Sequence, residues 1–245
     1  MELPPLDGHP DCVFVEDTTV AVGSTVLITS MGHPDRRGEE DSVADALASL
    51  RSSSTPDEHD GQSPANDTAT ATADRLRVLR ASELVPGARV DGGDVLFTGS
   101  HIFVGLSSRT NAAGVEALSL AFPDIPVEGV SVDGALHLKS LVTLCAPNTL
   151  AVSQCRHGTA AAATICDIGK RYGTSFSVVL LPSAALANVV LANGVLFHRA
   201  ESEHPGGAAA FSDLCGVRER VELKASEVEK ADGALTCCSI LLHLP

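Results

Sequence analysis

Four short segments of the chain carry side chains of the kinds that acid–base and nucleophilic catalysis use. The segments are PDCVFVED, DGGDVLF, DGALHLKS and ADGALTCCS, and their reactive residues are Asp11, Glu16, Asp17, Asp91, Asp94, His137 and Cys237. Thiol catalysis needs a thiolate, an imidazole that exchanges protons and a carboxylate that orients the imidazole. These residues are far apart in the sequence, and the chemistry therefore requires a fold that brings them together.

Four β-hairpins can be recognised from their turn residues. Gly23-Ser24, Gly99-Ser100, Pro147-Asn148 and Asn193-Gly194 each stand between β-branched or apolar runs. Glycine and asparagine supply the positive φ values that two-residue hairpin turns need. The predicted strand pairs are 18–22 with 26–29, 95–98 with 101–104, 141–146 with 149–152, and 188–191 with 195–198.

The hairpins belong to a repeat. Successive turns are 76, 48 and 46 residues apart. A helix is predicted after each hairpin, from apolar residues at helical spacing over 43–50 and 115–122, from the alanine-rich stretch 159–171, and over 208–214; a further strand comes next, at 76–79, 127–132, 176–181 and 217–223. The unit is therefore ββαβ, and its regular period favours blades around an axis over an open α+β sandwich. Most of the reactive residues precede the first strand of a unit, and equivalent positions of radial repeats meet at one end of the axis.

One segment interrupts the repeat. Residues 52–74 contain Ser, Thr, Ala, Asp and Pro but no Val, Ile, Leu, Met or Phe. Such a composition cannot bury enough apolar surface to offset the entropy lost on ordering. We therefore expect a single domain over residues 1–245, with 52–74 as a disordered surface insertion.

The composition excludes several classes of partner. The 245 residues carry a net charge of −14, only 3% are aromatic and none is Trp. This charge repels nucleic acid and anionic membranes, and few aromatic rings are available to stack on bases. The seven cysteines include no C-x-x-C pair, and the chain starts without a signal segment. Reduced thiols and a cytoplasmic location are expected, with no membrane span.

The segments PDCVFVED, DGGDVLFTG, VGLSSRTN, DGALHLKS and ADGALTCCS resemble the dimethylarginine dimethylaminohydrolases of the amidinotransferase (pentein) superfamily. The resemblance extends over the chain apart from the insertion. It implies an α/β fold, a five-fold ββαβ propeller, here apparently lacking most of the N-terminal unit. Residues 235–244 would then form an unpaired edge strand, and we expect a poorly stable chain or association through that edge, as a monomer or homodimer.

The resemblance also implies roles for individual residues. Cys237 would be the nucleophile and Cys238 a bystander, His137 the proton donor and later the base, and Asp91 the residue that orients His137. The substrate would be held by Asp11 and Glu16 at its guanidinium, by Asp17 at its α-ammonium, by Arg36 and Arg109 at its α-carboxylate, and by the backbone carbonyl of Ala231. No cofactor or metal is required, although zinc could bind Cys237 and His137 as an inhibitor.

The implied reaction converts Nω,Nω-dimethylarginine or Nω-methylarginine to citrulline through a covalent Cys237 thiouronium. The partner of the protein would then be a small cationic amino acid, the methylated arginine. Hydrolysis of this substrate would relieve inhibition of nitric oxide synthesis. Arginine deiminases are an alternative within the superfamily, but their His-x-Asp pattern is replaced by His137-Leu138-Lys139. A second alternative is a catalytically inactive, truncated propeller that acts as a binding module.

Overall fold

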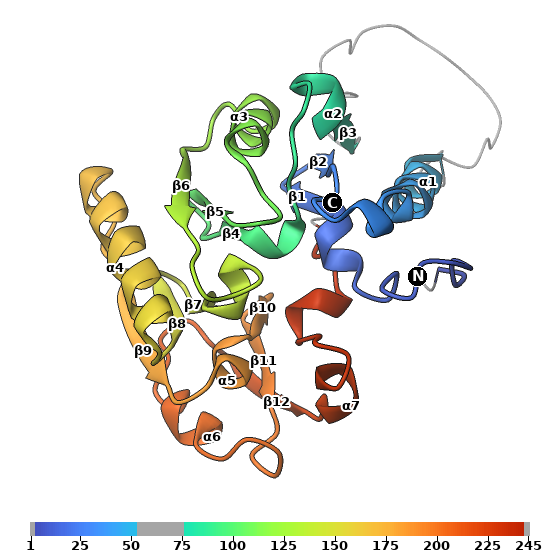
Figure 1. The fold of residues 1–245 in the computed structure, drawn as a ribbon. Helices are drawn as coiled ribbons and strands as arrows, with labels where there is room; N and C mark the ends of the chain where they lie inside the picture. The colour runs from blue at the N-terminus through green and yellow to red at the C-terminus, as the bar shows by residue number, and fades with distance from the viewer. Residues whose placement is uncertain (1–2, 53–75, 243–245) are drawn as a thin grey trace, which may run out of the picture.

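The computed structural model describes residues 3–52 and 76–242, which include four sheets of three strands each. The sheets follow one another around the molecule (Figure 1). Their strands are β1 (Thr19–Val22), β2 (Thr25–Ile28) and β3 (Arg77–Arg80); β4 (Val95–Phe97), β5 (Ile102–Leu106) and β6 (Val127–Ser131); β7 (Val142–Ala146), β8 (Thr149–Ser153) and β9 (Ser177–Leu181); and β10 (Val190–Ala192), β11 (Val195–Arg199) and β12 (Glu219–Leu223). The four predicted hairpins are confirmed. Apart from Ser52, the predicted insertion lies outside the described residues.

Each sheet has the same topology. The second strand is central; it pairs antiparallel with the first and parallel with the third. A tight turn is enough for the antiparallel pair, whereas the parallel pair needs a crossover, which a helix supplies. Asn193 and Gly194 show the turn chemistry, since both have positive φ, at 50° and 74°.

The crossover helices lie on the outer side of the sheets (Figure 1). They are α1 (Glu39–Ser52), α3 (Ala112–Ala121), α4 (Arg156–Arg171) and α6 (Gly207–Ala210). The last is shorter than the predicted 208–214. Three four-residue helices that the sequence pattern did not indicate follow third strands: α2 (Ala81–Leu84), α5 (Ala184–Ala187) and α7 (Ser226–Glu229). No helix in the described ranges is both long and apolar enough to cross a membrane.

The apolar core is divided among neighbouring units. One cluster joins Phe103 of β5 to Leu150 of β8 and Ile165 of α4, and another joins Leu27 of β2 to Val104 of β5. A third joins the β7–β9 and β10–β12 units. Each sheet therefore buries one side against the next, which is the packing of an α/β propeller.

Short 3-10 helices precede the first strands, and the candidate catalytic residues lie in them or, for Asp91 and His137, directly before them. These are η1 (Val15–Thr18), η3 (Gly92–Asp94) and η4 (Leu138–Ser140), and η5 (Thr236–Cys238) carries the cysteine. A further 3-10 helix, η2 (Pro34–Arg36), follows β2. The predicted positions at the start of each unit are confirmed for the units that begin with β1, β4 and β7.

The predicted strand over 235–244 is wrong for its described part. Residues 235–242 contain η5 and no strand, so the exposed strand edge inferred from it is not observed there. The backbone N–H of Thr236 donates to Asn188 Oδ1 at 2.9 Å, a side-chain partner in place of a neighbouring strand. Ile240 and Leu242 pack against the apolar cluster of β2 and α1.

Candidate active site

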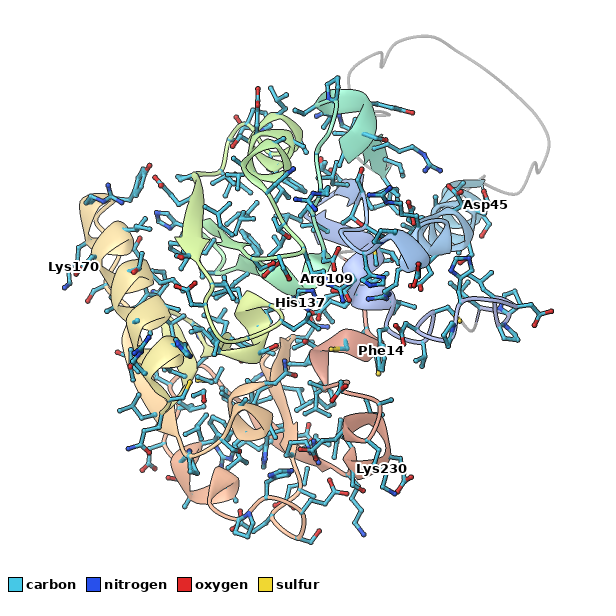
Figure 2. The ribbon with its side chains drawn as sticks, in the orientation of Figure 1. Phe14, Asp45, Arg109, His137, Lys170 and Lys230 are labelled. Carbon is cyan, nitrogen blue, oxygen red and sulfur yellow. The ribbon has the colours of Figure 1, made fainter. Side chains whose placement is uncertain are left out.

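A cavity of about 570 Å³ lies where the 3-10 helices meet. Eight of the nine predicted site residues line it: Asp11, Glu16, Asp17, Arg36, Arg109, His137, Ala231 and Cys237. The ninth, Asp91, is fully buried and bonded to His137. Figure 2 shows Arg109, His137 and Phe14 converging on the centre of the molecule. The tertiary fold thus gathers residues from both ends of the chain into one site.

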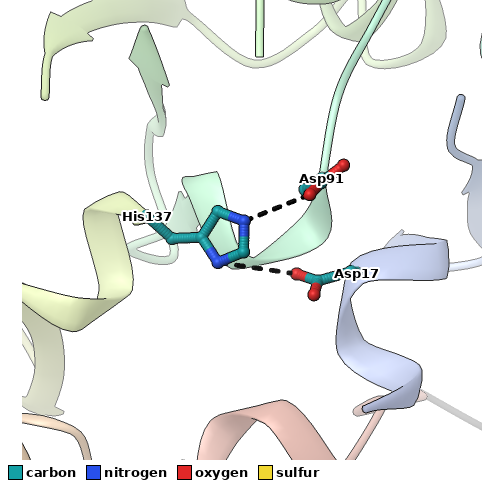
Figure 3. A group of neighbouring side chains, drawn as sticks. All are labelled: Asp17, Asp91 and His137. Carbon is teal, nitrogen blue, oxygen red and sulfur yellow. Dashed lines mark hydrogen bonds and ion pairs between the residues drawn. The ribbon is translucent and has the colours of Figure 1, made fainter. Parts of the chain in front are cut away.

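His137 is held by two carboxylates. Its Nε2 donates to Asp91 Oδ2 at 3.1 Å, and its Nδ1 lies 3.9 Å from Asp17 Oδ1 (Figure 3). Asp91 is itself fixed, since its Oδ1 accepts from the Gly32 N–H at 2.7 Å. Asp91 therefore sets the orientation of the ring, and Nδ1 is the nitrogen that remains for proton exchange.

The pKa of His137 is raised by these neighbours. Burial alone would lower it, but the hydrogen bond to Asp91 and the charges of Asp17, Asp94 and Asp91 outweigh that effect. A raised pKa favours the protonated imidazole, the form that a proton donor requires. The predicted chemical role of His137 is compatible with this environment.

Asp17 is held between η3 and Arg36. Its Oδ1 accepts from the Gly93 N–H at 2.8 Å, and its Oδ2 pairs with Arg36 Nη1 at 2.5 Å. Asp17 therefore lies beside His137, and its predicted role at the substrate α-ammonium stays a prediction. Its position follows from η1, which turns Asp17 towards η3 and His137.

The two glycines of DGGD allow this close packing. A Cβ on Gly93 would lie 2.6 Å from His137 Nδ1, and one on Gly92 would lie 2.0 Å from the Glu16 carbonyl oxygen. The following Asp94 links η3 to η4, because its carboxylate accepts from the Leu138 N–H at 2.9 Å. Burial raises the pKa of Asp94, although hydrogen bonds oppose the shift. Asp94 thus holds the backbone that carries His137.

Cys237 is half-buried in η5 and lines the same cavity, whereas Cys238 is exposed. Burial, together with the negative charge of Glu16, raises the pKa of the Cys237 thiol to about 12. The free thiol is therefore protonated at neutral pH. A cation bound in the cavity would favour the thiolate, since it offsets both the burial and the carboxylate charge.

Glu16 and Asp11 present their carboxylates differently. Glu16 is buried and already bonded, with Oε1 accepting from Lys139 Nζ at 2.5 Å and Oε2 from Thr236 Oγ1 at 2.8 Å. Asp11 is exposed. Both carboxylates line the cavity. Water screens the charge of buried Glu16 less than that of exposed Asp11, so Glu16 interacts more strongly with a charge in the cavity.

The two predicted arginines are not equivalent. Arg36 is 7% exposed and bonds to Asp17 and to both oxygens of Glu39. Its Nη2 also donates to the backbone carbonyls of Asp11 and Phe14. Burial tends to lower the pKa of Arg36, but the two carboxylates raise it overall. The donors of Arg36 thus hold the site together, and its predicted role as a carboxylate ligand stays a prediction.

Arg109 is the better candidate for binding a substrate carboxylate. Its side chain is 20% exposed, lines the cavity and approaches Asp91 Oδ2 at 3.8 Å. Ala231 is exposed in the loop between α7 and η5 and lines the same cavity.

One group of metal-ligating side chains occurs within the described ranges, formed by Asp17, Asp91 and His137. It does not include Cys237, so it differs from the predicted zinc pair. Hydrogen bonds and ion pairs already account for each of its carboxylates. We therefore interpret the two carboxylates of this group as residues that hold the His137 ring in place.

Sequence reasoning missed Asn188, which is 3% exposed. Its side chain donates hydrogen bonds to Thr236 in η5 and to the backbone carbonyl of Lys139 in η4. It stands before β10, the same place in the fourth unit that Asp91, Asp94 and His137 occupy in theirs. Its position in the repeat was the available signal. It was overlooked because an amide is not a typical acid, base or nucleophile.

Comparisons with known proteins place the chain among its relatives. The N(G),N(G)-dimethylarginine dimethylaminohydrolase of Streptomyces coelicolor is 34% identical over 245 residues, which cover 99% of this chain and 79% of that protein. The chain belongs to the dimethylarginine dimethylaminohydrolase family. The human protein DDAH2 is 30% identical over 249 residues, covering 99% of this chain and 77% of its own length. A search of protein-family models finds no match.

Solved structures of the dimethylarginine dimethylaminohydrolase family share the fold. An adduct of a dimethylarginine dimethylaminohydrolase with 4-chloro-2-hydroxymethylpyridine superposes with a TM-score of 0.69 at 21% identity, covering 96% of this chain and 80% of that one. The apo arginine dihydrolase of the cyanobacterial ornithine–ammonia cycle gives 0.70 at 18% identity, covering 99% of this chain and 34% of that one. The α/β propeller is therefore common to both kinds of enzyme.

Proposed function

We propose that this protein hydrolyses Nω,Nω-dimethylarginine and Nω-methylarginine to citrulline, releasing dimethylamine or methylamine. The observation that carries the proposal is the joint placement of Cys237, the His137–Asp91 pair and the Glu16 carboxylate around one cavity. Membership of the family supports it, since the relative from Streptomyces coelicolor is named for this reaction.

Binding begins with charge. The guanidinium of the substrate is a planar cation, and it meets carboxylates at Asp11, Glu16 and Asp17, while Arg109 faces the substrate carboxylate. We place Asp17 at the guanidinium end because it lies beside His137. Arg36 acts indirectly by fixing Asp17, and Ala231 offers a backbone carbonyl at the rim.

The first half-reaction forms a covalent intermediate. The bound cation lowers the pKa of the Cys237 thiol, which releases its proton to solvent, and the thiolate attacks the central guanidinium carbon. The C–N bond to dimethylamine then breaks, and the leaving nitrogen takes a proton from His137 Nδ1. A Cys237 thiouronium and a neutral His137 remain.

The second half-reaction consumes water. Neutral His137 removes a proton from a water molecule, which attacks the thiouronium carbon, and the C–S bond breaks to release citrulline. His137 is protonated again, and Asp91 stabilises its cation in both halves through the 3.1 Å hydrogen bond. The proposed reaction uses the side chains of this chain and needs no cofactor.

Lys139 favours a methylated substrate over arginine. An unsubstituted guanidinium carries additional N–H donors that an acceptor would have to satisfy, but the side chain at 139 is a cation that already pairs with Glu16. A dimethylated nitrogen has no hydrogen to donate, and it leaves no donor unpaired there. We further propose a cytoplasmic location, where a catalytic thiol stays reduced, and a single propeller domain.

The deciding experiment is an assay for citrulline with dimethylarginine, monomethylarginine and arginine, using Cys237→Ser as the control. We expect product from both methylated substrates and none from the control. Preference for arginine would identify a deiminase instead. A folded protein that makes no citrulline from any of the three would support the inactive binding module.

A further inference from the structure

We propose that Asn188 is a positioning residue that locks the nucleophile turn to the histidine turn. This inference rests on the proposed function. Asn188 lies between α5 and β10, is 3% exposed and belongs to the lining of the active-site cavity. An amide offers two donors and an acceptor, so one side chain can join several segments at once.

The hydrogen bonds of Asn188 join two turns that are distant in the sequence. Its Nδ2 donates to the Lys139 carbonyl in η4 at 3.0 Å and to Thr236 Oγ1 in η5 at 3.1 Å. Its Oδ1 accepts from the Thr236 N–H at 2.9 Å. Lys139 is two residues after His137, and Thr236 is next to Cys237. The proton donor and the nucleophile are thus tied to one buried amide.

Thr236 extends this connection to Glu16, one of the carboxylates that we propose hold the substrate guanidinium. Its hydroxyl donates to Glu16 Oε2 at 2.8 Å, and Glu16 Oε1 accepts from Lys139 Nζ. Asn188, Thr236, Glu16 and Lys139 form a closed ring of contacts that we call the Asn188 clamp. The clamp fixes the separation of the groups that must meet in the reaction.

The clamp replaces a strand partner for η5. The described residues 235–242 form no strand, so side chains must hold the turn that carries Cys237. Thr236 is buried and makes three of these hydrogen bonds, whereas Cys238, two residues further on, is exposed. We infer that loss of the clamp frees the cysteine turn while the four sheets remain packed.

Two changes test the proposal. Asn188→Ala removes the amide, and Thr236→Val removes only the hydroxyl while keeping the shape. We expect kcat to fall by on the order of 10²-fold in Asn188→Ala, because a misplacement of about 1 Å is enough for such a loss. KM should change much less, since Arg109 and the carboxylates remain. Thr236→Ser, which restores the hydroxyl, should recover most of the kcat that Thr236→Val loses.

A second readout follows the thiol itself and does not depend on turnover. Iodoacetamide labelling of Cys237 in the free enzyme, in a Cys238→Ser background, should be about threefold or more faster at pH 8 in Asn188→Ala, because a freed turn is less buried and its thiol pKa is lower. Thr98→Val is the matched control: it removes a buried hydroxyl bonded to His101 in the β4–β5 turn. Its labelling rate and kcat should equal those of the wild type.

The result that overturns the proposal is a folded Asn188→Ala with wild-type kcat, or equal changes in Asn188→Ala and Thr98→Val. If the wild type makes no citrulline, the proposed function fails, but Cys237 labelling still decides the clamp. Unchanged labelling in a folded Asn188→Ala, or in Thr236→Val if the first variant does not fold, refutes it.

Discussion

The raised pKa of Cys237 predicts an unusually unreactive thiol in the free enzyme. At pH 8 a thiol with an ordinary pKa of 9.0 is about 9% ionised, whereas one with a pKa of about 12 is about 0.01% ionised. The more basic thiolate is the better nucleophile, which recovers roughly 20-fold of that difference. We therefore expect Cys237 to react with a neutral alkylating agent roughly 50-fold more slowly than an ordinary thiol.

Cys155 provides an internal reference for this measurement. It is exposed, and the Gly158 N–H, which donates to its Sγ at 3.3 Å, lowers its pKa. Timed labelling with iodoacetamide at pH 8, followed by peptide mapping, compares the two cysteines in one sample. A Cys238→Ser background removes the ambiguity of the adjacent thiol. Cys155 should be labelled well before Cys237.

Glu16→Gln is the perturbation that tests the cause. Burial raises the Cys237 pKa most, and the Glu16 charge adds to it, while Lys139 acts in the opposite direction. Removal of the carboxylate charge leaves Lys139 unpaired beside the thiol, so both effects lower the pKa of Cys237. Its labelling should become faster, with that of Cys155 unchanged. Equal rates for Cys155 and Cys237 in the wild type, or no response to Glu16→Gln, would refute the reasoning.

Other substitutions separate the roles in the site. Asp91→Asn should lower kcat by on the order of 10³–10⁴, the range seen when a histidine loses its orienting carboxylate. Because Asp91 raises the pKa of His137, the same variant should move the basic limb of the kcat–pH profile to lower pH, and an unmoved limb would contradict the assignment. Gly93→Ala places a Cβ 2.6 Å from His137 Nδ1, so kcat should fall in a steady-state assay while substrate binding by calorimetry persists. Arg109→Met should raise KM by roughly 10- to 100-fold, the value of one charged hydrogen bond, with less change in kcat. Arg36→Met should instead lower the free energy of unfolding in urea by about 3–5 kcal/mol, since it leaves Asp17 and Glu39 buried and unpaired.

Much of the fold could be predicted because its signals are local. Asn193-Gly194 specifies a hairpin through backbone conformation alone, and the apolar spacing of α3 needs no partner to be recognised. Residues 235–242 show the limit of this reasoning. Their place after the fourth unit predicts the first strand of a fifth, yet Ile240 and Leu242 pack on β2 and α1, and the backbone of Thr236 is held by Asn188.

The sequence by itself determined the repeat, the reactive residues and their place before the first strand of each unit, because turn chemistry and periodicity are short-range. Only the tertiary structure decided how the charges are paired. Arg36 is committed to Asp17 and Glu39, and Lys139 pairs with Glu16, although nothing in their spacing indicates it. Ion pairing and burial depend on distances between segments far apart in the chain, and these same distances set the pKa values of His137 and Cys237.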